Sequence, residues 1–161
     1  MFELVKPRAE LFGAWSEAHR EWGPGLHEDG FGIGSNDDVD TVEGFRDWVA
    51  RMEQDSGELW WIVEDEEVLG GIALRAADDD RVHRVGHIGY GVRPSARGRG
   101  VAIWALGEVL RHAAALGIDP VLAFCLDNNA ASIATLERHG ATLEAVEQHG
   151  MARVRRYAIR S

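Results

Sequence analysis

The chain has 161 residues, of which 45% are apolar, and a single cysteine, so it is long enough to bury a core in one domain and lacks an intramolecular disulfide framework. Its formal net charge of -10 argues against nucleic acid or an anionic membrane as the main partner, because such partners are bound by cationic side chains that neutralise phosphates. No apolar run approaches the length of a membrane span and the first residues lack the layout of a secretory signal, so we expect a cytoplasmic protein with no nucleic-acid and no membrane partner.

The N-terminal part predicts a short strand, a helix and a long loop. Residues 2–5 are suited to a strand, and Pro7 is suited to the first turn of a helix. The helix has an apolar face, because apolar residues follow one another at helical spacing at Leu11, Trp15, Ala18 and Trp22. Residues 23–34 contain five glycines and a proline and predict a loop. A loop of this length inside a small domain often belongs to a binding site.

The next segment predicts a second helix and an antiparallel hairpin. Asp40 and Glu43 resemble a capping box at the start of a helix that ends before Ser56. Residues 59–63 form an almost wholly apolar run, and a charged turn separates it from a second run at 68–75. The two runs predict paired strands with a slightly long connecting loop.

The C-terminal half alternates strands and helices. Strands are predicted at 87–92 and 121–125, helices at 101–116 and 130–139, and a final hairpin joins 142–147 to 152–159. The crossover from the first of these strands through a helix to the second predicts one parallel pair. The fold class is therefore α+β in an α/β/α arrangement, with a mixed, mostly antiparallel central sheet of about six to seven strands and helices on both faces.

The stretch from Val92 to Ala102 reads V-R-P-S-A-R-G-R-G-V-A and joins a strand to a helix through a glycine-rich turn. Such a turn gathers unpaired backbone N–H groups and the positive end of a helix dipole around one point, which suits a phosphate or pyrophosphate. Two known phosphate-binding motifs do not fit this stretch. A Walker-type loop requires a lysine and a hydroxyl residue after its last glycine, and this chain has neither there. A dinucleotide-binding fingerprint requires a small residue at the position that Ile103 occupies. The remaining alternative is a surface turn that caps a helix and binds nothing.

Two motifs resemble those of the GNAT superfamily of acetyl-CoA-dependent N-acetyltransferases. The first, Arg97-Gly98-Arg99-Gly100-Val101-Ala102, is similar to the family signature of Gln or Arg, two residues, Gly, one residue, and Gly or Ala. The second, from Cys125 through Asn129 to Ser132 and on to the Glu137–Ala141 run, resembles the family's strand, Asn-x-x-Ser helix and helix stop. The resemblance covers roughly residues 59–161 and includes the ribosomal-protein N-terminal acetyltransferase-like subgroup and a subgroup of uncharacterised bacterial acetyltransferases. It implies an acyl-CoA N-acyltransferase fold.

The resemblance also implies a site for acetyl-CoA as cosubstrate. The pyrophosphate would take backbone N–H groups at the helix N-terminus, and the pantetheine arm would run like an added strand along residues 90–92, with Asn129 bonding it from the other side. The residues assigned to this site are Tyr90, Gly91, Val92, Arg93, Arg97, Gly98, Arg99, Gly100, Val101, Ala102, Asn129 and Ser132.

The catalytic residues that the resemblance implies include one departure from the family pattern. Many members carry a tyrosine as the acid for the leaving thiolate, whereas this chain has Leu136, so Ser132 is the candidate acid. The alternative is a serine that only caps or packs the first turn of its helix. His87 and Tyr90 are the candidate bases, and for His87 the alternative is a strand histidine satisfied by the backbone. Cys125, in an apolar strand, is expected to be a structural thiol.

We expect one GNAT-like domain over residues 1–161, in which residues 1–58 supply the acceptor side and residues 59–161 the CoA-binding core. The implied reaction is transfer of an acetyl group to a primary amine of a small molecule or a peptide N-terminus, by direct attack in a ternary complex. A sensor or interaction module that binds acyl-CoA without transferring it is the alternative that Leu136 keeps open. No His, Cys and Asp set has the spacing of a metal site, and a homodimer through the final hairpin is an option that the sequence does not require.

Six tryptophans are unusual for a chain of this length, and most of them should pack in the core. Trp22, beside the glycine-rich loop, and one of the pair Trp60 and Trp61 could instead form a wall of the substrate pocket.

Overall fold

The helices and strands of the computed structural model follow the order that the apolar pattern predicts, and residues 1–161 are all described. The strands are β1 (Glu3–Val5), β2 (Glu58–Glu64), β3 (Glu67–Leu74), β4 (Ile88–Val92), β5 (Val121–Leu126), β6 (Thr142–His149) and β7 (Ala152–Ile159). The α-helices are α1 (Phe12–Trp22), α2 (Val42–Glu53), α3 (Val82–Val85), α4 (Val101–Ala115) and α5 (Ala130–Arg138). None of these helices has both the length and the apolar character that crossing a membrane requires.

The seven strands form one mixed sheet in the order β1-β2-β3-β4-β5-β7-β6. Strands β4 and β5 pair in parallel, with Ile88 opposite Ala123, whereas β1–β2, β5–β7 and β6–β7 are antiparallel pairs. The predicted mixed, mostly antiparallel sheet and its parallel pair are confirmed. By their internal contacts the residues form two compact units, Met1–Ala73 with Tyr90–Val101, and Leu74–Gly89 with Ala102–Ser161.

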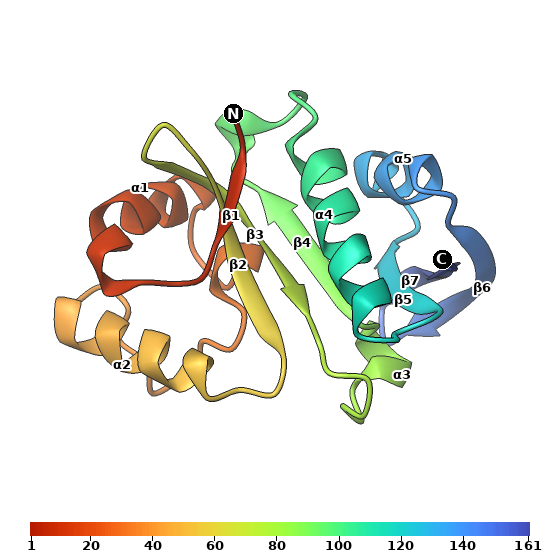
Figure 1. The fold of residues 1–161 in the computed structure, drawn as a ribbon, viewed down its shortest axis with the longest axis horizontal. Coiled ribbons are helices and arrows are strands. Elements are labelled where there is room, and N and C mark those ends of the chain that lie inside the picture. The colour runs from red at the N-terminus through yellow and green to blue at the C-terminus, as the bar shows by residue number, and fades with distance from the viewer. The chain divides into compact units, whose positions relative to one another are not determined.

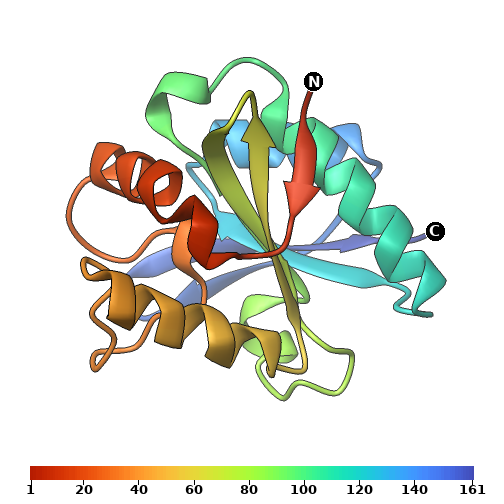
Figure 2. The same cartoon turned by 60° about the vertical axis from the view of Figure 1, so that its left-hand side comes forward.

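In the first unit, helices α1 and α2 lie on the same face of β1 and β2 (Figures 1 and 2). Four aromatic side chains that are at most 1% exposed meet there: Trp15 of α1, Phe45 and Trp48 of α2, and Trp61 of β2. The ring centroids of Trp15 and Trp48 lie 5.6 Å apart, and those of Phe45 and Trp61 lie 5.8 Å apart. These are the separations of packed aromatic pairs, and each ring removes a large apolar area from water, so this aromatic cluster contributes strongly to the stability of the unit.

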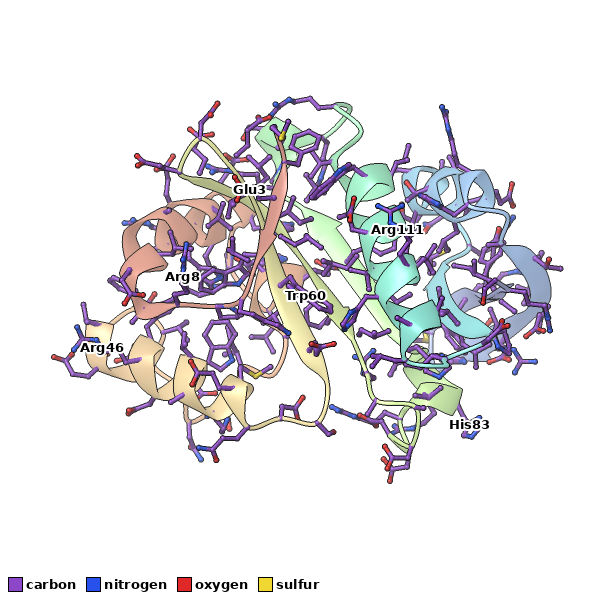
Figure 3. The ribbon with its side chains drawn as sticks, in the orientation of Figure 1. Glu3, Arg8, Arg46, Trp60, His83 and Arg111 are labelled. Atoms are coloured by element: carbon purple, nitrogen blue, oxygen red, sulfur yellow. The ribbon has the colours of Figure 1, made fainter.

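The neighbours Trp60 and Trp61 point to opposite faces of β2, as the alternation of side chains along a strand requires. Trp61 is buried in the aromatic cluster, whereas Trp60 is partly exposed and its ring centroid lies 4.2 Å from Nζ of Lys6. Figure 3 shows the Trp60 side chain on the side of β2 that faces away from α1 and α2. Of the pair, only Trp60 keeps the exposure that a pocket wall needs.

The predicted capping box at the start of α2 is wrong. The N-cap is Thr41, whose Oγ1 accepts a hydrogen bond from the backbone N–H of Gly44 at 3.1 Å. Asp40 lies outside the helix, and its N–H donates to Oδ1 of Asp38. The local bond between the two aspartates therefore moves the helix start by one residue, and Glu43 falls at the second helical position instead of the third.

Two further boundaries differ from the prediction. Pro7 does not lie in the first turn of α1, because Arg8 is extended and a 3-10 turn precedes the α-helix, which begins at Phe12. The hairpin between β2 and β3 is tighter than expected, with only Asp65 and Glu66 between the strands. Both have positive φ, at 49° and 68°, which is the conformation of a two-residue type I′ turn.

In the second unit, helices α4 and α5 lie side by side (Figure 1). Nε2 of His139, at the end of α5, donates to the carbonyl oxygen of Ile103 in α4 at 2.8 Å. Gly107 makes room for this ring, because a Cβ there would lie 3.1 Å from Cε1 of His139. The short helix α3, between β3 and β4, is not among the predicted helices, and its residue Val82 is buried.

Candidate functional site

The loop that is predicted to bind a phosphate or pyrophosphate lies in the first unit, between the end of β4 and the start of α4. Gly98 and Gly100 both have φ of +78°, a conformation that favours glycine, and a Cβ at either position would meet no atom within 4 Å. The backbone N–H groups of residues 98–101 donate to no carbonyl of the loop, and the first N–H groups of a helix have no intrahelical partner. The loop therefore presents unpaired donors at the positive end of α4, which is an arrangement that binds phosphate groups.

Arg93 anchors the start of this loop. Its side chain is buried, and Nε and Nη2 both donate to Oε1 of Glu21 in α1, at 2.9 and 2.6 Å. The same carboxylate accepts from the N–H and the hydroxyl of Ser95, at 2.7 and 2.8 Å. These bonds, led by that of Arg93, lower the pKa of Glu21 to about 2. The guanidinium is committed to this anchor, so only the backbone of Arg93 is left for its predicted contact with CoA.

The other two arginines of the loop are exposed and bond within the first unit. Arg97 donates from Nε to the carbonyl oxygen of Val92 at 2.9 Å. Arg99 pairs through Nη2 with Glu64, and this hydrogen bond is the largest cause of the lowered pKa of the Glu64 carboxyl. Because an exposed ion pair contributes little net free energy, a polyanion at the loop can compete with Glu64 for the guanidinium group of Arg99.

A short 3-10 turn, Glu28–Gly30, crosses the backbone of β3 and β4. A Cβ at Gly71 would lie 2.2 Å from the carbonyl oxygen of Glu28. A Cβ at Gly91 would lie 2.7 Å from Cβ of Glu28 and 2.8 Å from its Oε2. Any larger residue at either position would displace the turn. The Glu28 carboxylate thus lies directly over Gly91, in the strand that the predicted pantetheine arm follows.

Asp29 fixes this turn from inside the core. Its carbonyl oxygen accepts from Nε1 of Trp15 at 2.9 Å and from Nε1 of Trp61 at 3.1 Å. Its carboxylate is fully buried, and Oδ2 lies 3.0 Å from Nδ1 of His19. That hydrogen bond is the largest cause of the raised pKa of His19, and burial of the imidazole opposes it. Neither Glu28 nor Asp29 is marked by the sequence, because both lie in an aperiodic loop.

We expect the stability contributed by His19 and Asp29 to fall as pH rises. A raised pKa means that the folded state holds the proton more tightly than the unfolded state. The contribution is therefore fully present below the ordinary value of 6.5 and is lost as pH rises through the raised value. The difference in unfolding free energy between wild type and His19→Gln, from urea denaturation, should shrink between about pH 6 and about pH 8. A difference that grows over this range would contradict the pairing.

An aromatic stack lies next to this turn. The rings of Trp22 and His27 are stacked, with centroids 5.6 Å apart and an interplanar angle of 7°. His27 also lies with Nε2 at 3.2 Å from the carbonyl oxygen of Gly23. His27 immediately precedes Glu28 in the chain, and the interpretation of Trp22 as a pocket wall stays a prediction.

His87, a candidate base, is buried and bonded to the neighbouring strand. Its backbone N–H donates to the carbonyl oxygen of Leu122 at 2.8 Å, and its Nδ1 accepts from the N–H of Leu122 at 2.9 Å. Burial, with a smaller contribution from His83, lowers the pKa of this imidazole. With Nδ1 as acceptor the neutral ring carries its proton on Nε2, which then has no lone pair to receive another. The geometry favours the alternative of a backbone-satisfied histidine.

Asn129 and Ser132 lie together in the second unit, at the start of α5. Asn129 is the N-cap, and its Oδ1 accepts from the N–H of Ser132 at 3.1 Å. The Ser132 side chain hydrogen-bonds the thiol of Cys125, whose pKa is raised, chiefly by burial. A buried thiol with a raised pKa is a poor nucleophile, in agreement with a structural Cys125. Leu136, one turn along the helix, is fully buried.

The structure therefore groups the predicted site residues by unit. Residues 90–101 and the unpredicted Glu28 belong to the first unit, whereas Asn129 and Ser132 belong to the second. No group of three or more His, Cys, Asp and Glu side chains is placed to hold a metal ion.

Residues 8–142 match a family model described as an acetyltransferase (GNAT) domain. An acetyltransferase from Salmonella typhimurium that modifies the N-terminal serine of the 50S ribosomal subunit protein L7/L12 is 21% identical, with a TM-score of 0.73 over 99% of this chain and 95% of that chain. The RimL ribosomal L7/L12 α-N-protein acetyltransferase in complex with coenzyme A is 20% identical, with a TM-score of 0.72 over 99% of this chain and 93% of that chain.

The microcin C7 self-immunity acetyltransferase MccE, in complex with acetyl-CoA and AMP, is 16% identical, with a TM-score of 0.72 over 99% of this chain and 92% of that chain. No curated protein matches the chain. At these identities the likeness to solved structures shows a common fold, the acyl-CoA N-acyltransferase fold that the two motifs imply.

Proposed function

Because this chain belongs to the GNAT acetyltransferase family, we propose that it transfers an acetyl group from acetyl-CoA to a primary amine by direct attack in a ternary complex. Two of the structures that share its fold hold coenzyme A or acetyl-CoA. The observation that carries the proposal is the loop at residues 98–101, where two open glycines and unpaired N–H groups lie at the start of a long helix. This loop suits the pyrophosphate of CoA.

The chemistry requires the chain to hold the thioester and to move two protons. Backbone groups of residues 90–92 would hold the pantetheine arm in the manner of an added strand. A base removes a proton from the attacking amine, backbone N–H groups stabilise the oxyanion, and an acid protonates the thiolate that leaves. We assign the acid to Ser132, which lies at the third position of α5 with its hydroxyl beside Cys125.

The acceptor proposed is a peptide N-terminus or a small cationic amine. Relatives of the same fold modify the N-terminus of a ribosomal protein, which supports the first class. The net charge of -10 and the carboxylate of Glu28 beside β4 favour an acceptor that approaches as a cation. The single cysteine agrees with a reducing compartment such as the cytoplasm.

The proposal is tested by incubating the protein with acetyl-CoA and a panel of amines while free thiol is followed. The panel contains a serine-initiated peptide, a linear polyamine and an aminoglycoside. Thiol release that depends on one of these amines would support transfer. A rise in melting temperature with acetyl-CoA and no turnover on any amine would favour the acyl-CoA sensor instead. No rise with either acetyl-CoA or CoA would refute the site.

We expect Ser132→Ala to lower kcat by about 10²-fold or more with little change in the affinity for acetyl-CoA, because the leaving thiolate would lose its proton donor. The variant loses the bond of the Ser132 hydroxyl to the Cys125 thiol, but helix α5 should be retained, since the N-cap bond uses the backbone N–H of residue 132 and alanine is a strong helix former. Steady-state kinetics and a CoA titration measure the two quantities. Ser56→Ala, at an exposed turn, is the matched control. Unchanged kcat in Ser132→Ala would assign the acid elsewhere.

A further inference from the structure

The carboxylate of Glu28 is partly exposed and has no hydrogen-bond or ion-pair partner in the protein. Other carboxylates of the same unit are bound by arginines: Glu21 by Arg93, Asp37 by Arg51 and Glu64 by Arg99. An unpaired carboxylate that is held against a strand, and that water can still reach, keeps its lone pairs for a ligand.

The position of this carboxylate is fixed by its surroundings. The Glu28 carbonyl oxygen lies where a Cβ of Gly71 would stand, and the next residue, Asp29, is held by two indole N–H groups and by His19. These contacts immobilise the backbone that carries Glu28. The side chain of Glu28 can still change rotamer. In the structure it places the carboxylate over β4.

The face of β4 is also determined. Side chains alternate along a strand, so Gly91 presents its missing Cβ toward Glu28, whereas Tyr90 and Val92 point to the opposite face. Because glycine has no side chain, the Glu28 side chain packs directly against the β4 backbone, with its Cβ and Oε2 where a Cβ of Gly91 would stand. A carbonyl bound at this part of the strand would lie within reach of Oε2 of Glu28, which is 2.8 Å from the Cβ position of Gly91.

We propose that Glu28 is the general base that deprotonates the acceptor amine. This inference rests on the proposed acetyl transfer and gives it a catalytic residue on the acceptor side. The amine nitrogen attacks the thioester carbonyl carbon and forms the C–N bond, while an Oε atom of Glu28 takes the proton that the nitrogen loses. The C–S bond then breaks, and the thiolate leaves with its electron pair and is protonated by the acid or by solvent.

The comparison with His87 strengthens the assignment. Nδ1 of His87 is occupied by the N–H of Leu122, whereas both oxygens of Glu28 can accept a proton. A carboxylate also attracts a protonated amine, which loses its first proton to water; Glu28 then takes the second proton, which the nitrogen loses as it attacks, so one group serves both recognition and proton removal.

The test is Glu28→Gln, which keeps the size of the side chain and removes its basicity. With the amine of the panel that wild type acetylates best, we expect kcat to fall by about 10²- to 10⁴-fold. The rise in melting temperature caused by acetyl-CoA should be unchanged. Glu28→Asp keeps the carboxylate on a side chain that is shorter by one methylene. Its kcat should lie between those of wild type and Glu28→Gln. Glu53→Gln, an exposed glutamate at the end of α2, is the matched control and should keep wild-type kcat.

A second readout separates a base from a structural role. Hydroxylamine is a nucleophile that is already neutral at neutral pH and needs no strong base, so the rate deficit of Glu28→Gln should be much smaller with hydroxylamine than with an alkyl amine. A deficit below about tenfold with the alkyl amine, or an equal deficit with both nucleophiles, would overturn the proposal. If Glu28→Gln fails to fold, the same comparison is made with Glu28→Asp. Wild type that binds acetyl-CoA but acetylates no amine would refute the proposed function itself, and the base with it.

Discussion

Gly100→Glu is expected to abolish the stabilisation of the protein by acetyl-CoA. The new carboxylate would project from the loop at residues 98–101, since a Cβ of residue 100 meets no atom within 4 Å, and it would repel the pyrophosphate. A ligand present at about 100 times its Kd stabilises the folded state by about 2.7 kcal/mol. For a chain of this size that corresponds to a rise of about 5–10 °C in melting temperature, which the variant should lose. Thermal unfolding with and without acetyl-CoA measures it.

Gly117→Glu is the matched control for this prediction. Gly117, at the end of α4, has the same φ of +78° as Gly100, and a Cβ there also meets no atom within 4 Å. Both variants therefore carry the same backbone strain and the same change in charge. The unliganded melting temperatures should fall together, and only Gly100→Glu should lose the response to acetyl-CoA. If Gly100→Glu keeps the response, the pyrophosphate does not bind at this loop.

Trp61→Ala is expected to lower the free energy of unfolding by about 3–5 kcal/mol, the largest loss among the substitutions proposed. The side chain is fully buried among Trp15, Phe45 and Trp48, so truncation removes apolar burial and leaves a cavity in the aromatic cluster. It also removes one of the two indole N–H groups that bind the carbonyl oxygen of Asp29. The loss is measured from the midpoint of urea unfolding at constant m-value.

Trp60→Ala tests whether the loss depends on the face of the strand. Trp60 is the adjacent residue on β2 and points to the other side, where its ring lies near Lys6 and is partly exposed (Figure 3). Its truncation should cost about 1–2 kcal/mol, because part of its area is already in water. Equal losses for the two variants would contradict the placement of Trp61 in the core.

Local sequence patterns sufficed for most of the fold. The apolar periods of α2, α4 and α5 and the apolar runs of β2, β3 and β5 predict these elements, because periodicity and breaking glycines act within a few residues. The predictions that fail concern the boundaries of elements. Thr41 replaces Asp40 as the cap of α2, since several polar neighbours compete for the same N–H groups. Helix α1 begins at Phe12, after a 3-10 turn, and the hairpin between β2 and β3 has a two-residue turn.

The proposed CoA-binding loop is likewise predicted from a short stretch of the chain. A strand, two glycines with positive φ and a helix start are contiguous in the chain, so residues 92–102 by themselves predict an anion-binding loop. The sequence also carries the order of the two motifs that mark the family. It does not reveal that Arg93 is committed to Glu21, because that ion pair joins a loop to a helix far away in the chain.

The position of Glu28, which we propose as the general base, was decided only by tertiary structure. Glu28 lies over Gly91 because Gly71 and Gly91 lack side chains and because Trp15, Trp61 and His19 hold the adjacent residue. These contacts join segments that are remote in sequence, and the loop that carries Glu28 has no periodic pattern from which its inward-facing residue could be read. The periodicity of a helix or strand shows which of its residues face the core. The neighbours of a carboxylate in a loop depend instead on how segments that are remote in sequence pack around it.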